Sequence, residues 1–511
     1  KKYDMSGGGH FHSGDNINAV VADIGSYATK LGFAGEDYPK SYFRSNAAVQ
    51  HTDNVVSSIK YDYYTRPLND DDKYKVCNPV DDATGLWYGE SELWYTLLEK
   101  YIQHGYKSAL NSKTENHPLL LVERSYNPPP IRQQVLELLF EELHVPAAFL
   151  ARDATMACYA CGRSTGTVVD VGYSGTTVTP VFDGYVEKNG IRRLPVGTRS
   201  MDEQIVRNLD EVADKPFLPL YRLQKYDQRQ DAIHDLARMQ VAQQCREEGP
   251  GAAVQVVSDG SFMAPSMPYE LPDGTKIQIP SKQRFGVADS ILGQQPDSIA
   301  LREEALSSIR AKLERRIAEA DDDKDEENKG DKEYYEQVFS KASSVGLLKR
   351  RQEDTTSKHK KRKTDTTNNI KKFGHTWKYL KKACSNALQQ QRDDYLSSST
   401  IPSLVCDAAF RCDREQQPAL LGNVIVAGGG ACLGPTDQAL PDFIRENVES
   451  VIHQHTPGWR VKVLSPNFQE RSVCSWLGGS ILGSLGTFHD MWITKDEYDE
   501  WGSAIVNRKC P

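Results

Sequence analysis

The sequence predicts an α/β protein built from two similar halves around a nucleotide cleft. A buried-looking apolar strand runs into Asp-x-Gly, a tight polar turn and a second strand, and this pattern occurs twice, over residues 20–33 with Asp23 and over residues 167–181 with Asp170. Up to about residue 295, short apolar strands alternate with amphipathic helices, as in α/β proteins. We therefore expect an internal duplication, with a ligand held between the copies.

The chemistry of the two turns predicts that this ligand carries phosphates. Gly25 and Gly172 let the backbone turn sharply and bring N–H groups close to a polyphosphate. Because a carboxylate repels phosphate, Asp23 and Asp170 are expected to act through Mg²⁺ or its waters. Lys30 lies on the strand face opposite Leu31 if that residue packs in the core. One Asp-x-Gly is usually an ordinary turn, but two flanked by strands favour a clamp on one Mg-nucleotide.

Composition limits the class of protein. With 511 residues, the chain can form two large domains, and its 39% hydrophobic and 26% charged residues are typical of globular proteins. No stretch has the apolar length of a membrane span, so an intracellular protein without a membrane partner is expected. The ten cysteines are scattered, as expected for reduced thiols, and Cys158-x-x-Cys161 is interpreted as core packing. A net charge of −8 argues against binding nucleic acid by bulk electrostatics.

Individual elements follow from local patterns. Strands are predicted over residues 117–122 and 423–427, and helices over residues 131–143 and 154–160. The second strand runs into Gly428, Gly429 and Gly430, which permit backbone contact with a flat ligand such as a purine or ribose. A C-terminal helix is predicted over residues 476–488, with Ile481, Leu482, Leu485 and Phe488 on one stripe, and its glycines indicate close approach of another backbone or a ligand.

The predicted organisation includes a long charged insertion. Acidic residues 321–327 and basic clusters at 349–351 and 358–363 cannot bury apolar surface, so a partly disordered surface segment is expected. The basic clusters fit a nuclear import signal or a patch that contacts DNA, and a plain solvated loop is the alternative. The expected parts are an N-terminal tail (1–18), a first half (19–165, with a separate segment at about 45–85), a second half (166–295 and 399–470), the insertion (296–398) and C-terminal helices returning to the first half (471–511).

Several motifs resemble actin, in the same order along the chain. They are Asp-Ile-Gly-Ser at 23–26, Lys-Leu-Gly-Phe-Ala-Gly-Glu-Asp-Tyr-Pro at 30–39, Gly-Arg-Ser-Thr-Gly at 162–166, Tyr-Glu-Leu-Pro-Asp-Gly at 269–274, Ser-Trp-Leu-Gly-Gly-Ser at 475–480 and Met-Trp-Ile-Thr-Lys-Asp-Glu-Tyr at 491–498. The resemblance implies the actin-like fold of the hexokinase and Hsp70 type. The position of the insertion is similar to that of the nuclear actin-related protein 4 subgroup, as are Asp-Ile-Gly-Ser-Tyr at 23–27, Val-Ile-Val-Ala-Gly-Gly at 424–429, Ser-Leu-Gly-Thr-Phe at 484–488 and Arg-Lys-Cys-Pro at 508–511. That subgroup implies a scaffold subunit shared by Ino-eighty and Swr chromatin remodellers and NuA-type histone acetyltransferases.

The resemblance also implies an ATP site, with Mg²⁺ held through water by Asp23 and Asp170. Arg246 and Glu247 would meet the adenosine, although they could instead be plain surface charges. The implied ATP-binding residues are Asp23, Gly25, Ser26, Lys30, Asp170, Gly172, Arg246, Glu247, Gly428, Gly429 and Gly430.

Four positions depart from the actin pattern. Asp153 stands at the glutamine that positions the attacking water, Thr177 at the assisting histidine, Tyr173 at the acid of the second hairpin, and Tyr27 at a glycine of the first. Hydrolysis needs a group that orients water and groups that stabilise the phosphoryl charge. We therefore predict no catalytic residue and a nucleotide that is bound but turned over slowly or not at all, although Asp153 could itself act as a base.

In actin-like folds, the cleft opposite the nucleotide accepts amphipathic helices. Here the predicted partner is the helicase/SANT-associated helix of a remodeller ATPase, with nuclear actin alongside; other actin-related proteins, histones or DNA are further expected partners. Leu482 and Leu485 could instead be core residues of the terminal helix. The residues expected to line this groove are Tyr159, Gly162, Leu482, Leu485, Thr487 and Met491.

Two other functional classes compete with the nuclear scaffold. A filament-forming cytoskeletal ATPase needs an intact subdomain 2 loop, but residues 45–85 do not resemble it and carry an acidic run at 70–72. A small-molecule kinase of the related hexokinase-like fold needs an acceptor pocket with a carboxylate base, and the sequence shows no motif for one.

Overall fold

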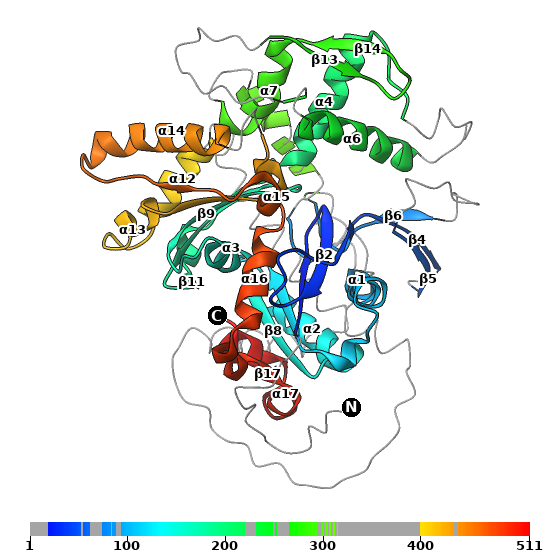
Figure 1. Ribbon diagram of the computed structural model, residues 1–511, viewed down its shortest axis with the longest axis vertical. Helices are drawn as coiled ribbons and strands as arrows, with labels where there is room; N and C mark the ends of the chain where they lie inside the picture. Colours follow the sequence, from blue (N-terminus) through cyan, green and yellow to red (C-terminus); the bar gives the residue numbers. More distant parts are fainter. Residues whose placement is uncertain are drawn as a thin grey trace. The chain divides into compact units, whose positions relative to one another are not determined.

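Figure 1 shows a computed structural model of the chain. It describes residues 19–52, 55–61, 74–82, 84–87, 94–219, 231–248, 251–252, 265–293, a few positions between 298 and 314, 399–433 and 438–511. The predicted tail, the acidic run at 70–72 and most of the insertion, with its acidic run and basic clusters, lie outside the described residues. Lys1–Ile309 and Gln390–Pro511 form one compact unit. Of the second unit, Arg310–Gln389, only residues 310, 311 and 314 are described, and they are helical.

The first large sheet is built around the first Asp-x-Gly hairpin. Strand β1 pairs antiparallel with β2 and parallel with β7. The strand order is β17-β8-β7-β1-β2-β3. The strands are β1 (Val20–Ile24), β2 (Ala28–Phe33), β3 (Ser41–Arg44), β7 (Leu119–Glu123), β8 (Ala147–Arg152) and β17 (Ile493–Thr494).

The second large sheet repeats this arrangement. Strand β9 pairs antiparallel with β10 and parallel with β15, so each sheet contains the same hairpin beside the same kind of parallel strand. The predicted duplication is confirmed. The order is β11-β10-β9-β15-β16, and β12 pairs with β10. The strands are β9 (Gly166–Val171), β10 (Thr176–Phe182), β11 (Tyr185–Val186), β12 (Arg192–Leu194), β15 (Val424–Ala427) and β16 (Val463–Leu464).

The strands next to the hairpins form the centre of each half because they are apolar, except for Glu123 at the end of β7. All five residues of β7 and all four of β15 are buried, as expected for parallel strands covered on both faces. Two smaller sheets are also present. One is ordered β5-β4-β6 and the other pairs β13 with β14. Their strands are β4 (Ala47–Thr52), β5 (Val55–Lys60), β6 (Lys75–Cys77), β13 (Met267–Glu270) and β14 (Lys276–Ile279).

The helices lie around the sheets (Figure 1). The predicted helix at 131–143 is confirmed as α2, which continues as a π-helix over Leu138–Glu142, and the helix at 154–160 as α3. The α-helices are α1 (Trp94–Ala109), α2 (Pro129–Glu137), α3 (Asp153–Ala160), α4 (Thr198–Ala213), α6 (Asp231–Glu247), α7 (Ser281–Leu292), α12 (Ile401–Phe410), α13 (Gln417–Leu421), α14 (Ala439–His455), α15 (Phe468–Arg471), α16 (Cys474–Ser484), α17 (Lys495–Trp501) and α18 (Val506–Lys509). No helix in the described part of the chain is long and apolar enough to cross a membrane.

Helix α16 packs closely across α3. A Cβ atom at Gly478 would collide with the carbonyl oxygen of Met156, so the close backbone approach expected from the glycines is present. The predicted single helix over 476–488 is wrong, because α16 ends at Ser484 and Leu485 is extended. The glycine that follows favours this break, and Phe488 then packs in the core against other aromatic rings rather than on the same stripe.

Candidate nucleotide-binding site

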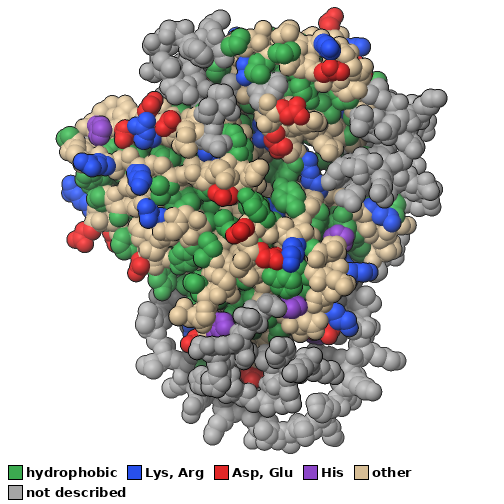
Figure 2. Space-filling model, in the orientation of Figure 1, with side chains coloured by type: hydrophobic (Ala, Val, Ile, Leu, Met, Phe, Trp, Pro, Cys, Tyr) green, Lys and Arg blue, Asp and Glu red, His purple; other side chains and the backbone are tan. Residues whose placement is uncertain are grey.

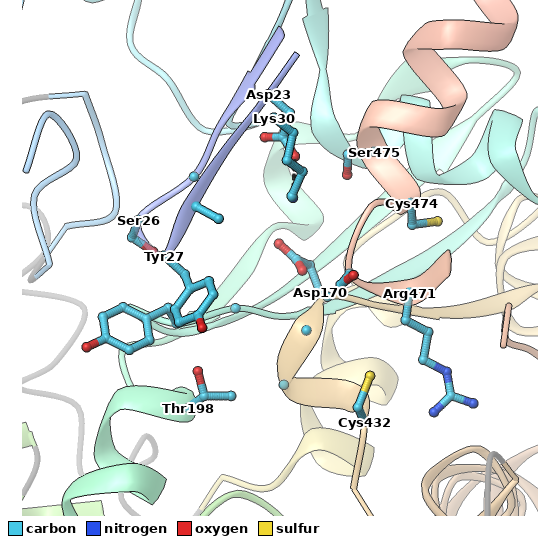
Figure 3. A pocket seen from close by; sticks show the side chains of 18 of the residues that line it. Asp23, Ser26, Tyr27, Lys30, Asp170, Thr198, Cys432, Arg471, Cys474 and Ser475 are labelled. Atoms are coloured by element: carbon cyan, nitrogen blue, oxygen red, sulfur yellow. Dashed lines mark hydrogen bonds and ion pairs between the residues drawn. The ribbon is translucent and has the colours of Figure 1, made fainter. Parts of the chain in front are cut away.

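A cavity of about 480 Å³ lies between the turns of the two duplicated hairpins. Figure 3 shows Asp23 and Lys30 of the first sheet facing Asp170 of the second across it. Its volume lies within the range of small-molecule sites, roughly 300–1,000 Å³. The structure brings all eleven residues proposed for nucleotide binding to this one cavity: Asp23, Gly25, Ser26, Lys30, Asp170, Gly172, Arg246, Glu247, Gly428, Gly429 and Gly430.

The two hairpin turns close in the same way. The Gly25 N–H donates to the Ala28 carbonyl at 3.1 Å, and the Gly172 N–H donates to the Gly175 carbonyl at 3.0 Å. These two amides are therefore used inside the turns and are not the donors available to a phosphate. The next amides, of Ser26 and Tyr173, have no acceptor among the described residues, and both residues line the cavity. They form the anion-binding part of each turn.

Lys30 lines the cavity as an ionised group. Its neighbour Leu31 is buried in the core, so the two side chains lie on opposite faces of the strand, as the alternation of side chains along a strand predicts. The Lys30 Nζ lies 2.8 Å from Asp23 Oδ2. Burial lowers the pKa of Lys30, but the Asp23 carboxylate and Tyr42 together outweigh burial and leave that pKa above its ordinary value. The ammonium group therefore stays charged beside the hairpin.

Sequence reasoning missed Arg124, which directly follows β7 and lines the cavity. Its Nη1 donates to Asp170 Oδ2 at 3.0 Å and to Asp153 Oδ2 at 3.2 Å. Burial lowers the pKa of Arg124, but Asp170 and Asp153 outweigh burial and raise it. The sequence contains one indication of this role, because Arg124 is a basic residue directly after the strand that lies beside the first hairpin.

The expectation that Asp23 and Asp170 act through Mg²⁺ or its waters stays a prediction. Each carboxylate already has a cationic partner from the chain, Lys30 for Asp23 and Arg124 for Asp170. Across the described residues, His, Cys, Asp and Glu side chains form no group of three or more placed to hold a metal ion.

The glycine loop after β15 serves both packing and the cavity. Gly428 has φ +91°, and a Cβ atom there would clash with Asp170 and lie 2.5 Å from the Val171 carbonyl oxygen. A Cβ at Gly430 would lie 2.5 Å from Thr198 Cγ2. At Gly429, by contrast, the nearest atom is Ser472 Cβ at 3.9 Å. Packing therefore requires the outer two glycines, whereas Gly429 leaves open surface toward a ligand.

Arg246 is not the plain surface charge that was the alternative. It is 4% exposed, and its Nε donates to Asp202 Oδ1 at 2.7 Å, with Asp202 2% exposed. Its Nη1 is buried and has no hydrogen-bond partner among the described residues, so it is an unsatisfied donor of a residue that lines the cavity. The side chain of Glu247 is half exposed and accepts a hydrogen bond from Gln243 Nε2 at 2.6 Å.

Two of the residues that depart from the actin pattern lie away from the cavity lining. Neither Asp153 nor Thr177 lines the cavity. Asp153 Oδ1 accepts from the backbone N–H groups of Ser125 at 2.9 Å and Ala154 at 2.8 Å, and its Oδ2 accepts from Arg124. Asp153 thus anchors the start of α3, which disfavours its interpretation as a base acting on water.

The other two departures meet across the cavity. The rings of Tyr27, from the first hairpin, and Tyr173, from the second, have centroids 5.5 Å apart. The Arg44 guanidinium lies 3.8 Å from the Tyr27 ring centroid, and its Nη2 donates to Gln243 of α6 at 2.5 Å. These contacts link the two halves beside the cavity.

Comparison with known proteins agrees with this geometry. The family model described as Actin matches residues 14–327 and 339–511. The chain belongs to the actin family. The α/β architecture is therefore the actin-like fold that the sequence predicts. Similar proteins include Actin-related protein 4 of Oryza sativa (26% identity), Schizosaccharomyces pombe (25%) and Emericella nidulans (27%). Each alignment covers 98% of this chain, and 100%, 99% and 98% of the respective relative.

The residues expected to line a helix-binding groove lie around the ends of α3 and α16. Tyr159 and Leu482 are half-buried, and Gly162 and Thr487 are exposed. Leu485 is 47% and Met491 42% exposed, so the alternative that Leu485 is a core residue is wrong. On the face seen in Figure 2, basic and acidic side chains are mixed rather than gathered by sign, so this face does not favour nucleic acid.

Proposed function

We propose that this protein is a nuclear actin-related scaffold subunit of chromatin-remodelling and histone acetyltransferase complexes, stabilised by a bound ATP that it does not use for catalysis. Its partners would be the helicase/SANT-associated helix of a remodeller ATPase together with actin, with other actin-related proteins, histones or DNA in the same assembly. The chromatin role rests on the resemblance to the actin-related protein 4 subgroup. The nucleotide role rests on the cavity.

One observation carries the nucleotide part of the proposal. The phosphate-binding turns and the glycine loop converge on one cavity, whereas Asp153, at the water-positioning position, is held outside it. An enzyme of this fold needs a side chain that orients water toward the terminal phosphate. A bound nucleotide would instead hold the two halves together, and a ligand at a thousandfold excess over its Kd adds about 4 kcal/mol of stability.

The nucleotide proposal is tested on the purified full-length protein. Chromatography of the supernatant after heat denaturation should show one equivalent of ATP rather than ADP, and phosphate release should be far slower than from actin measured in parallel. Phosphate release at the rate of actin would refute the non-catalytic role. An absence of any bound or bindable nucleotide would refute the nucleotide role.

The partner proposal is tested at Leu485, because this exposed side chain can be changed without opening the core. A charge in an apolar interface is costly unless it is paired. Leu485→Asp should therefore abolish copurification with the partner helix while the protein stays soluble and nucleotide-bound. Val451→Asp, at an aliphatic residue on α14 that is 37% exposed, is the matched control and should copurify normally. Normal partner binding by soluble Leu485→Asp would refute the site.

The filament alternative makes a different prediction. A filament-forming protein should pellet with Mg-ATP in a sedimentation assay at concentrations where actin pellets. The scaffold proposal predicts that the isolated protein stays in the supernatant, whereas protein assembled with its partners sediments with the complex.

A further inference from the structure

The cation of the nucleotide site is part of the protein chain. Arg124 reaches from the end of β7 toward both hairpins. Its Nη1 lies 3.0 Å from Asp170 of the second hairpin, and a Cβ atom placed on Gly25 of the first hairpin would lie 3.8 Å from its Nη2. The guanidinium therefore lies between the two phosphate-binding turns. A bridging metal ion would have to occupy the same interval.

Arg124 is held in place both at its backbone and through the partners of its guanidinium. The Arg124 carbonyl accepts from the Asn127 N–H at 2.9 Å and from Arg152 Nη1 at 3.3 Å. Its partner Asp153 is fixed by the Ser125 and Ala154 backbone amides. Such a preorganised side chain loses little freedom when a ligand binds.

Both carboxylates expected to act through Mg²⁺ already have a cationic partner in the chain, although Arg124 also pairs with Asp153. Lys30 pairs with Asp23 at 2.8 Å, and Arg124 pairs with Asp170, so neither carboxylate is left as a free ligand. Mg²⁺ requires near-octahedral oxygen ligands and keeps several waters. A fixed guanidinium repels a dication, and it cannot be neutralised because arginine does not lose its proton in proteins. The residues present therefore do not fit the magnesium site that the family resemblance implies.

From this arrangement, we propose that Arg124 takes the place of the divalent cation, so that the cavity binds the triphosphate of ATP without Mg²⁺. This inference rests on the proposed nucleotide-binding function. Lys30 and Arg124 would flank the phosphate chain, and the free amides of the two turns would contact its oxygens. The planar guanidinium can donate to a phosphate with the nitrogen that faces Gly25 while it keeps its bond to Asp170.

The test compares ATP binding with and without metal in the full-length protein. The probe is a fluorescent ethenoadenosine triphosphate, titrated by anisotropy in excess EDTA and again in excess Mg²⁺. The wild type should show Kd values that agree within about threefold, a difference well under 1.4 kcal/mol. Arg124→Ala should weaken binding in EDTA by roughly ten- to a hundredfold, as expected for loss of a charge-assisted contact, and Mg²⁺ should restore part of it.

Two further variants control for charge and folding. Arg445→Ala removes one positive charge from the surface of α14 and should bind as the wild type does. Arg124→Lys keeps the charge but lacks the second nitrogen, Nη2, that faces Gly25 while Nη1 bonds Asp153 and Asp170, so its affinity in EDTA should lie between those of the wild type and Arg124→Ala. If Arg124→Ala does not fold, the wild-type comparison and Arg124→Lys still decide the question.

Each outcome has one meaning. Binding by the wild type only in the presence of Mg²⁺ would overturn the role of Arg124 and leave the proposed nucleotide function intact. Equal binding by wild type and Arg124→Ala in EDTA would also overturn it. No binding in either buffer would overturn both this inference and the nucleotide function.

Discussion

The buried ion pair between Arg246 and Asp202 allows a sharp test of how the cavity is held together. Both side chains are almost fully buried, and Nε of Arg246 lies 2.7 Å from Oδ1 of Asp202. This pair joins α6 to α4 and leaves Nη1 of Arg246 without a partner among the described residues. Asp202→Leu should therefore leave a buried guanidinium beside the nucleotide cavity, with only the half-exposed Glu247, 3.8 Å from its Nη2, as a counter-charge.

The expected cost follows from the burial of the pair. Removing one member of a buried ion pair costs about 3–5 kcal/mol, because the remaining charge stays desolvated. That is a large part of a typical total stability of about 5–15 kcal/mol. Removing both charges with apolar residues of similar volume is often neutral. The double variant Asp202→Leu/Arg246→Met should therefore recover most of the stability that Asp202→Leu loses.

Thermal melting followed by circular dichroism, with and without excess ATP, measures both effects. Asp202→Leu should melt well below the wild type, and the double variant close to it. The double variant should also gain less from ATP, because it lacks the unpartnered Arg246 donor. Melting of Asp202→Leu at the wild-type temperature, or a double variant as unstable as Asp202→Leu, would refute the reasoning. A full ATP response in the double variant would show that Arg246 does not contact the ligand.

Three further predictions concern other parts of the chain. Gly428→Ala should destabilise the protein by about 1–2 kcal/mol or more and abolish nucleotide retention, because its φ of +91° and the nearby backbone exclude a side chain. Gly429→Ala should keep the wild-type melting temperature, and equal melting of the two variants would contradict this prediction. Burial opposes ionisation of Glu497, but its bonds to Lys509 and Thr494 lower its pKa, so the carboxylate contributes stability at neutral pH that is lost as the pH falls below about 4.3. Glu497→Gln should therefore cost about 1 kcal/mol at pH 7 and less in acid. The same loss of stability at neutral and acidic pH would refute this prediction. Alanine at both basic clusters, residues 349–351 and 358–363, should reduce nuclear accumulation of a fluorescently tagged variant in cells depleted of the partners. Unchanged nuclear fluorescence would assign the insertion another role.

Local pattern determined the elements that surround the site. The two Asp-x-Gly turns follow apolar strands, and each hairpin does lie beside a parallel strand. The side of the strand on which Lys30 lies could be predicted because side chains in a strand alternate between its faces. The glycines of α16 likewise indicated close backbone packing, which Gly478 makes against Met156. In each case, the information lay within a few residues of the position concerned.

Tertiary structure alone decided how the charges of the site are paired. Arg124 and Asp170 are 46 residues apart, and Asp202 and Arg246 are 44 apart, so no local pattern joins them. Helix α16 ends at Ser484, and Phe488 then contacts aromatic rings in the core, which the apolar stripe could not show. Local spacing sets the backbone of each turn, whereas the partner of a buried charge depends on which side chains folding brings within a few ångströms, where the cost of leaving that charge unpaired is high.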